Sequence, residues 1–216
     1  MQTYKLILFD LDGTLSDPKV GITKSVQYAL CKMGIEDPDL DKLECFIGPP
    51  LQDSFKEYYG FDEEQTQKAI ELYRERFVDK GMFENELYPN IPSLLKQLKE
   101  QGSTLIVATS KPTIFAEKIM SYFEIKHYFE HVVGSNLDGT RVAKTEIIQY
   151  ILDKYRDQKR DDFIMIGDRK HDIIGANNTK IASIGVTYGY GTRDELQQTS
   201  PTHIVDSVEQ LKKLLM

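Results

Sequence analysis

The chain has 216 residues, of which 40% are hydrophobic and 10% aromatic, and its formal net charge at pH 7 is −7. This composition suffices for one large α/β domain or for a core domain with a small insert. The acidic balance argues against a nucleic-acid or anionic-membrane surface, where basic patches are expected, although a small anionic substrate can still bind at a locally positive site.

The beginning of the chain enters an apolar strand almost at once and lacks the charged-then-apolar layout of a signal peptide. No segment of the sequence is long enough and apolar enough to cross a bilayer. The two cysteines, Cys31 and Cys45, match no metal-ligand spacing. We therefore expect a cytoplasmic protein with reduced thiols.

The first predicted element is a buried strand over residues 5–9, and two acidic residues follow it. Asp10 comes directly after the apolar run, and Asp12 stands two positions later, before Gly13 and Thr14. Because side chains alternate in an extended segment, Asp10 and Asp12 are expected to project the same way beyond the strand. Such a pair can bind a divalent metal or divide the roles of nucleophile and acid/base. Taken alone, the segment also fits an acidic turn.

Residues 17–87 are predicted to form a helical segment, since apolar residues recur there at helical spacing and no strand is evident. The expected helices are a long one after Asp17-Pro18 that ends at Gly34, a short one from Asp37-Pro38, one near residues 51–59 and one near residues 62–80. Gly48-Pro49-Pro50 interrupts the segment, because proline supplies no N–H and restricts the preceding residue. Asp62 and Gln65 predict a capping box.

The second half of the chain alternates between short apolar runs and helices. The expected strands are residues 104–108, 131–134, 162–167 and 182–186, and the expected helices are residues 91–100, 114–123, 144–155 and 207–215. Short, wholly apolar strands separated by helices are typical of a parallel sheet covered on both faces. The sequence therefore predicts an α/β protein. Its core is a doubly wound, Rossmann-like parallel sheet built from residues 1–16 and 88–216, and residues 17–87 form an inserted α-helical cap domain.

Polar residues that could do chemistry follow several of these strands. Thr109 and Ser110 follow the second strand, and Asp168 and Asp172 follow the fourth. Lys144 stands at the start of the helix between the third and fourth strands. Ligands of open α/β sheets bind beyond the carboxyl ends of the strands. Four separate segments, the one with Asp10 included, are thus expected to bring carboxylates, hydroxyls and a cation to one sheet edge.

This set of residues resembles the haloacid dehalogenase superfamily in its phosphatase branch, and residues 107–112 and 167–172 resemble phosphoglycolate-phosphatase-type members. The matching motifs, in order over essentially the whole chain, are Asp10-Leu11-Asp12-Gly13-Thr14, then Thr109, then Lys144, then Gly167-Asp168 with Asp172. One departure concerns Lys144, which often precedes a proline in the family but is followed here by Thr145. Arg141 is therefore an alternative for the positive group.

The resemblance implies a phosphoryl-transfer reaction. Asp10 is expected to attack phosphorus and form an aspartyl-phosphate intermediate. Asp12 is expected to protonate the leaving alkoxide and then to activate the water that hydrolyses this intermediate. Dehalogenase-type relatives act on carbon and lack the second aspartate, so Asp12 favours phosphoryl transfer.

The resemblance also implies a phosphate site and a metal site. Thr109, Ser110 and Lys144 are expected to bind phosphoryl oxygens. Mg²⁺ is the expected cofactor. Its expected ligands are Asp10, the Asp12 carbonyl and Asp168, with Asp172 acting through water or as an orienter of Lys144.

The segment 17–87 lies where the small helical caps of the superfamily occur. The resemblance implies that it excludes water and contacts the substrate, and Gly48-Pro49-Pro50-Leu51 resembles a cap loop that faces the active site. Gly48 and Pro49 are therefore expected substrate contacts. The expected substrate is a small phosphorylated metabolite, such as phosphoglycolate, a sugar phosphate or a nucleoside monophosphate, and the protein is expected to be a monomer or a homodimer.

Two other functions fit the same residues. A phosphomutase of the β-phosphoglucomutase kind would use the same aspartate but return the phosphate to the sugar, so its product would be an isomerised sugar phosphate. A binding or regulatory protein could keep the fold without turnover, but the presence of Asp10, Asp12, Lys144 and Asp168 argues against it. Release of inorganic phosphate separates the phosphatase from both alternatives.

Overall fold

The computed structural model of the chain describes residues 4–36 and 39–216. The chain divides into two compact units, one formed by Met1–Asp17 with Leu87–Met216 and the other by Pro18–Glu86. Two short strands, β2 (Ser16–Asp17) and β3 (Glu86–Leu87), stand at the two passages of the chain between the units and form a two-stranded sheet.

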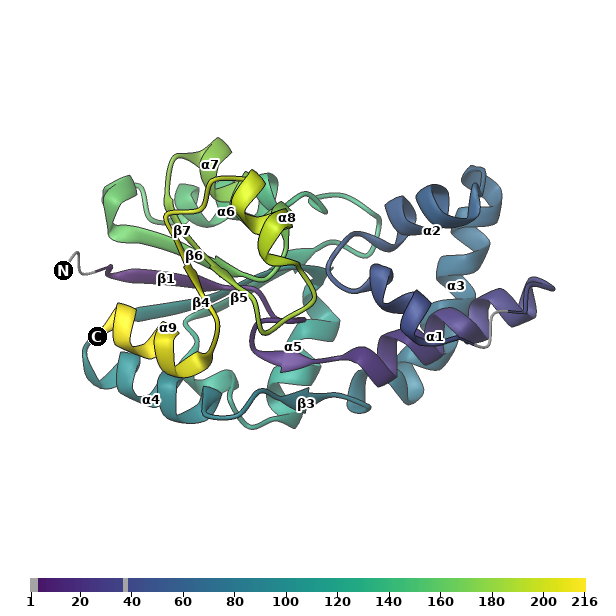
Figure 1. Cartoon of the computed structure of the whole chain (residues 1–216), viewed down its shortest axis with the longest axis horizontal. Coiled ribbons are helices and arrows are strands. Elements are labelled where there is room, and N and C mark those ends of the chain that lie inside the picture. Colours follow the sequence, from purple (N-terminus) through teal and green to yellow (C-terminus); the bar gives the residue numbers. More distant parts are fainter. Residues whose placement is uncertain (1–3, 37–38) are drawn as a thin grey trace. The chain divides into compact units, whose positions relative to one another are not determined.

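The first unit is built on a six-stranded sheet with the strand order β5-β4-β1-β6-β7-β8 (Figure 1). The strands are β1 (Leu6–Phe9), β4 (Thr104–Pro112), β5 (His131–Ser135), β6 (Phe163–Gly167), β7 (Ala182–Val186) and β8 (His203–Val205). Every neighbouring pair in this sheet is parallel, which confirms the predicted parallel α/β sheet. The strand β8 was not predicted, because it has three residues and begins at an exposed histidine.

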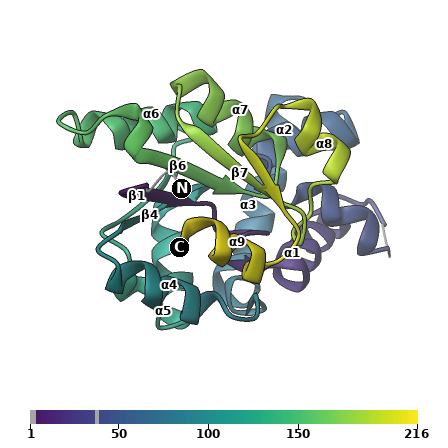
Figure 2. The ribbon, with the colours of Figure 1, turned by 60° about the vertical axis from the view of Figure 1, so that its left-hand side comes forward.

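Helices cover both faces of the sheet (Figure 2). The helices α4 (Ile91–Glu100), α5 (Thr113–Tyr122) and α9 (Val208–Leu215) lie on one face, and α6 (Lys144–Lys154) and α7 (Lys170–Thr179) lie on the other. Two helices of this unit were not predicted, α7 and the short α8 (Arg193–Gln198), which contacts α7. Along the described ranges, no helix combines the length and the apolar character needed to span a membrane.

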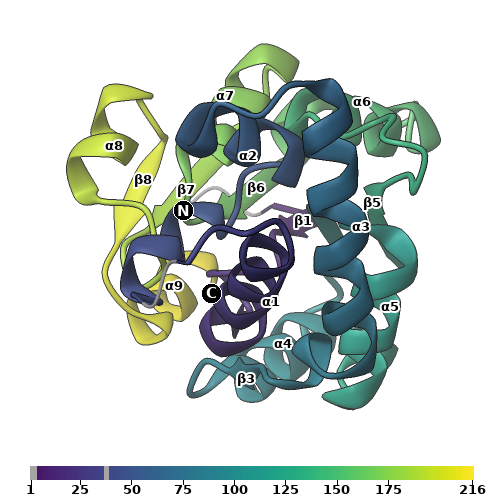
Figure 3. The same cartoon turned by 90° about the vertical axis from the view of Figure 1, so that its right-hand side faces the viewer.

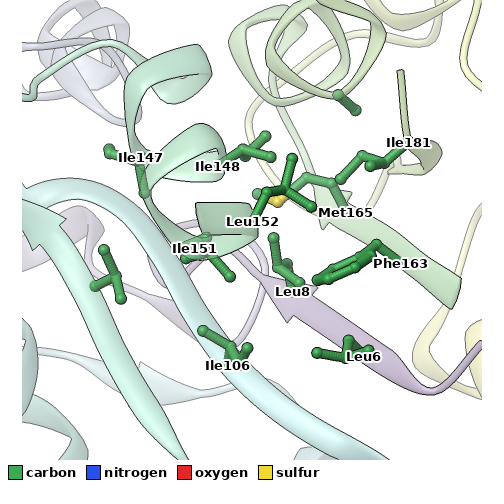
Figure 4. Close-up of a cluster of buried hydrophobic side chains, with 13 residues drawn as sticks. Leu6, Leu8, Ile106, Ile147, Ile148, Ile151, Leu152, Phe163, Met165 and Ile181 are labelled. Carbon is green, nitrogen blue, oxygen red and sulfur yellow. The ribbon is translucent and has the colours of Figure 1, made fainter. Parts of the chain in front are cut away.

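The central strands are held by apolar side chains that pack against α6 (Figure 4). Leu8 of β1 lies between Ile106 of β4 and Met165 of β6 at one level of the sheet, and all three are fully buried. Ile148 and Ile151 of α6 belong to the same cluster. Burial on both faces explains why these strands are continuous apolar runs. The packing fixes the carboxyl ends of β1, β4 and β6 side by side, and the candidate site lies at these ends.

The second unit is helical and contains α1 (Lys19–Lys32), α2 (Leu51–Tyr59) and α3 (Glu63–Asp79), with two short 3-10 helices, η1 (Asp41–Phe46) and η2 (Gly81–Phe83) (Figure 3). Within it, α3 packs against both α1 and α2. The helix predicted from Asp37-Pro38 starts outside the described residues, and the part of it that is described forms η1, the tighter type of turn that short segments adopt. Cys31 and Cys45 form no disulfide.

Residues noted in the sequence explain where α2 ends and where α3 begins. Gly60 ends α2 at a φ of 64°, a left-handed conformation that glycine adopts without strain. Asp62 and Gln65 form the predicted capping box, in which the Gln65 N–H donates to Asp62 Oδ1 at 2.8 Å and the Asp62 N–H donates to Gln65 Oε1 at 3.1 Å.

Truncation of the central strand is expected to cost more stability than truncation at the surface. Leu8→Ala should lower the free energy of unfolding by about 2–5 kcal/mol, because it leaves a cavity between β1 and α6. Leu137→Ala, at a side chain that is 50% exposed, should change it by less than about 0.5 kcal/mol. Chemical denaturation of both variants measures the difference, and equal losses would contradict the assignment of Leu8 to the core.

Candidate active site

Several buried polar residues meet at the carboxyl ends of β1, β4 and β6, three neighbouring strands. They are Asp10 after β1, Thr109 near the end of β4, Lys144 at the start of α6, Asp168 after β6 and Asp172 in the first turn of α7. None of them is more than 5% exposed. Charged side chains are almost never buried to this degree without partners, so their contacts define what the site can do.

The Lys144 ammonium contacts two carboxylates and a main-chain carbonyl of β4. Its Nζ lies 3.0 Å from Asp10 Oδ1 and 2.7 Å from Asp172 Oδ1, and it donates to the Ala108 carbonyl at 2.8 Å. Each of its three N–H groups therefore has a partner. Burial disfavours the charged form, but the Asp10 and Asp172 carboxylates outweigh it and raise the pKa of Lys144 above its ordinary value. Lys144 is thus a permanent cation between these two acids.

Arg141, the alternative positive group, has other partners. Its Nε donates to the Gly134 carbonyl at 2.9 Å, and its Nη2 donates to Asn136 Oδ1 at 3.1 Å. Its guanidinium carbon lies 4.4 Å from the centroid of the Tyr150 ring. The missing proline after Lys144 therefore does not bring Arg141 to the two acids.

Asp10, Asp168 and Asp172 form a buried acidic triad, in which one oxygen from each carboxylate lies within 4.8 Å of the others. Burial raises the pKa of Asp168 well above its ordinary value, and Asp172 and Asp10 raise it further. Burial also raises the pKa of Asp172, to about 6, against the opposing effect of Lys144. Three carboxylates this close repel unless a cation or a proton lies between them. A cluster of hard oxygen donors at this spacing fits a divalent metal ion.

Asp12 is paired with a lysine that the sequence analysis did not select. Lys111 Nζ lies 2.8 Å from Asp12 Oδ2, and the two side chains are 6% and 9% exposed. Burial raises the pKa of Asp12, although Lys111 opposes this effect. The other oxygen, Asp12 Oδ1, is buried and accepts no hydrogen bond from the described residues. The spacing from Thr109 was the available signal, since residues two apart in a strand face the same side.

Among the described residues, three carboxylates lie close enough together to share a metal ion, and the carboxylate of Asp12 is not one of them. The metal ligand expected from Asp12 is its main-chain carbonyl, and this stays a prediction.

Thr109 is 2% exposed, and its hydroxyl accepts the Lys111 N–H at 3.3 Å. Ser110 is half-buried beside it. Gly48 and Pro49 belong to the helical unit, between η1 and α2, and their contact with a substrate also stays a prediction.

The loop after β7 encloses Asp168 and was missed by the sequence analysis. The Tyr190 N–H donates to Asp168 Oδ2 at 2.8 Å, and the Thr14 hydroxyl donates to Asp168 Oδ1 at 3.4 Å. The Tyr188 hydroxyl donates to the Thr14 carbonyl at 3.0 Å. Gly13 has a φ of 80°, and a Cβ at this position would overlap the Asp168 carboxylate. The loop and the turn after Asp12 therefore hold Asp168 from two sides.

Comparison with known proteins places these residues in a family context. A family model described as haloacid dehalogenase-like hydrolase matches residues 7–186. A 5′-nucleotidase of Pseudomonas aeruginosa is 49% identical over 98% of this chain and 96% of its own length. The tyrosine-protein kinase PtkA of Mycobacterium tuberculosis is 34% identical over 98% of this chain and 72% of its own length. A phosphoglycolate phosphatase of Vibrio parahaemolyticus is 28% identical over 99% of this chain and 97% of its own length.

A solved structure agrees over the whole fold. The crystal structure of a predicted phosphatase from Clostridium acetobutylicum is 50% identical and superposes with a TM-score of 0.96, covering 99% of this chain and 98% of that chain.

Metal affinity is expected to fall as the pH falls through about 6. A carboxylate binds a metal when deprotonated, and the raised pKa values of Asp172 and Asp168 keep these groups protonated at higher pH than ordinary aspartates. Mg²⁺ is therefore expected to bind more tightly above pH 6 than below it. Titration calorimetry with Mg²⁺ on both sides of this pH measures the change, and an affinity that does not vary with pH would contradict it.

Asp168→Asn is expected to stabilise the metal-free protein and to weaken its response to metal. Because burial and the neighbouring acids raise the pKa of Asp168, this carboxyl lowers the stability of the metal-free protein above its ordinary pKa, and an amide, which does not ionise, removes that cost and can still accept the Tyr190 N–H. In the absence of metal at pH above 7, Tm should rise by about 2–4 °C, equivalent to roughly 1 kcal/mol. Added Mg²⁺ should then raise Tm less than in the unchanged protein. Asp157→Asn, at an exposed position, is the matched control and should change neither value.

Proposed function

Because the chain belongs to the haloacid dehalogenase-like hydrolase family and is a phosphatase, a phosphoric monoester hydrolase, we propose that it hydrolyses a small phosphomonoester through a covalent intermediate on Asp10. The observation that carries this proposal is that Asp10 and Asp12 have different partners. Asp10 contacts Lys144 and belongs to the acidic triad, whereas Asp12 contacts Lys111 and stands outside the triad. Two acids in different surroundings can take different roles in one reaction.

Asp10 is proposed as the nucleophile. The Lys144 ammonium and the Leu11 N–H both bond to Asp10 Oδ1, at 3.0 and 2.8 Å. These bonds hold the carboxylate in one rotation, so Oδ2 is the oxygen proposed to attack. An oxygen–phosphorus bond forms to Asp10 while the ester oxygen–phosphorus bond breaks, which leaves an aspartyl-phosphate and an alkoxide.

Asp12 is proposed as the acid and then as the base. Burial favours the protonated carboxyl, which can transfer its proton to the leaving alkoxide. The resulting carboxylate then takes a proton from water, and the hydroxide formed attacks phosphorus. Inorganic phosphate leaves, and Asp10 and protonated Asp12 are regenerated.

Charge explains why a metal is needed. Two like unit charges about 4 Å apart repel by about 4 kcal/mol at an effective dielectric constant of about 20. A phosphate dianion would meet four carboxyl groups and the two ammonium groups of Lys111 and Lys144. A divalent ion held by Asp10, Asp168 and Asp172, which we propose to be Mg²⁺, would supply the missing positive charge. Thr109 and Lys144 are proposed to bind the phosphoryl oxygens, and Lys144 would exchange one of its three present contacts for a phosphoryl oxygen when the substrate binds.

The proposed substrate class is a nucleoside 5′-monophosphate, with phosphoglycolate as the second choice. The order follows similarity, since the 5′-nucleotidase relative is 49% identical and the phosphoglycolate phosphatase relative 28% identical. Gly48 and Pro49 of the helical unit are proposed to contact the group that carries the phosphate. Specificity of this kind has to come from residues other than the reacting acids.

A panel of phosphomonoesters tests the function. Purified protein with Mg²⁺ should release inorganic phosphate, with the highest kcat/KM on nucleoside 5′-monophosphates, and a chelator should abolish the release. Asp10→Asn should reduce the rate to background, and Asp12→Asn should reduce it by about 10²–10⁴-fold. Acid quenching followed by mass spectrometry should locate a phosphoryl group on Asp10.

Other products would identify other reactions. Full activity of Asp10→Asn would overturn the nucleophile assignment. An isomerised sugar phosphate without free phosphate would indicate a phosphomutase, and phosphate delivered to a protein tyrosine would indicate a kinase. No turnover on any ester of the panel would indicate a protein that binds but does not react.

A further inference from the structure

We propose that Lys111 is a positioning residue, which holds the Asp12 carboxyl so that Oδ1 faces the reacting phosphoryl group. The inference rests on the proposed function of Asp12 as acid and base. It assigns to Lys111 a role separate from that of Lys144, because each lysine contacts a different member of the Asp10–Asp12 pair.

The Lys111–Asp12 ion pair is buried, unlike the surface pairs of the protein. The two side chains are 6% and 9% exposed, whereas those of Lys5 and Asp162 are 66% and 18% exposed. Exposed pairs contribute little because both side chains move and solvent screens them. A buried pair at 2.8 Å holds its carboxylate in place, and loss of one partner leaves the other charge uncompensated.

The pair fixes the direction of the second Asp12 oxygen. A carboxyl turns about one bond, so a contact to Oδ2 also sets the position of Oδ1. In the described part of the chain, Oδ1 is buried and accepts no hydrogen bond. A buried polar oxygen without a partner is destabilising, and a hydrogen-bonding partner removes this cost. The leaving oxygen of the substrate, and later the attacking water, are the partners that the proposed reaction brings.

The backbone of β4 aims Lys111 at Asp12. The register between β4 and β5 shifts between Ala108 and Pro112, and Lys111 lies within this irregular segment. Irregularities of this kind redirect side chains and are common beside active sites. The Lys111 N–H also donates to the Thr109 hydroxyl at 3.3 Å, which ties the lysine backbone to a proposed phosphate-binding residue.

The N–H groups of Lys144 already have other partners. Its three N–H groups are shared among Asp10, Asp172 and the Ala108 carbonyl, so a contact with Asp12 would require it to give up one of them. Lys111 is thus the ammonium that the fold supplies to Asp12.

The test compares two leaving groups in the first turnover. An alkoxide leaves with a proton from Asp12, whereas p-nitrophenolate is stable enough to leave without one. In rapid-quench experiments, Lys111→Met should slow phosphorylation of Asp10 by a nucleoside 5′-monophosphate by about 10–100-fold, a part of what a positioned general acid contributes. Release of p-nitrophenolate from p-nitrophenyl phosphate should change less than about 3-fold.

A double-mutant cycle separates positioning from other roles. If Lys111 acts through Asp12, adding Lys111→Met to Asp12→Asn should cause no further loss with the alkyl ester. Lys111→Arg should restore most of the rate, since it returns the positive charge. Lys5→Met removes a surface ion pair and should leave all rates unchanged. Thermal unfolding of each variant establishes that it is folded, and Lys111→Gln replaces Lys111→Met if the latter does not fold.

Two results would overturn the proposal. Equal slowing with both esters would show that Lys111 supports the fold or binds phosphate generally, and a further loss in the Asp12→Asn background would show that it acts independently of Asp12. Failure of the proposed function is recognised separately, because the unchanged protein would then release no p-nitrophenolate or Asp10→Asn would release it normally.

Discussion

The candidate site depends on one electrostatic constraint, the placement of four aspartate carboxyls at a buried sheet edge with two lysines to balance them. Lys144 contacts Asp10 and Asp172, and Lys111 contacts Asp12, so positive charge is distributed between the two proposed reacting acids. Asp168 has main-chain and hydroxyl partners instead of a lysine, and burial and its acidic neighbours raise its pKa well above the ordinary value. Without a metal this arrangement is short of positive charge, and a divalent ion held by the three acids of the triad would supply it.

The apolar core makes this concentration of charge possible. Leu8, Ile106 and Met165 pack at one level of the sheet, and the polar residues begin only a few positions further along each strand. A parallel sheet brings all carboxyl ends to one edge, where the helices on its faces also begin. Lys144 and Asp172 lie in such first turns. The free energy gained by burying the strands thus offsets the cost of holding like charges together.

The sequence predicted those site residues that follow a strand within a few positions or begin the next helix, because period and turn chemistry are local properties. Asp10, Lys144, Asp168 and Asp172 were placed at one edge on this ground, and the family resemblance behind them is confirmed by the match over residues 7–186. Lys111 was missed because its local signal, the spacing of two residues from Thr109, does not show the register shift between β4 and β5 on which the direction of its side chain depends. The loop around Tyr188 and Tyr190 was missed for a similar reason, since its contacts with Thr14 and Asp168 join segments more than 150 and about 20 residues apart. The strand β8 was too short to show a period.

The two proposed roles of Asp12 place opposite demands on one carboxyl. It must hold a proton until the alkoxide leaves and then act as a carboxylate toward water, so surroundings that fixed it as fully neutral or fully charged would stop one half of the reaction. Burial and Lys111 act on it in opposite directions, the first raising its pKa and the second lowering it. Because Lys111 occupies Oδ2 and leaves Oδ1 open, the same contact that moderates the charge leaves the second oxygen available for proton transfer in both steps. A single buried lysine can therefore serve both halves of the cycle without moving.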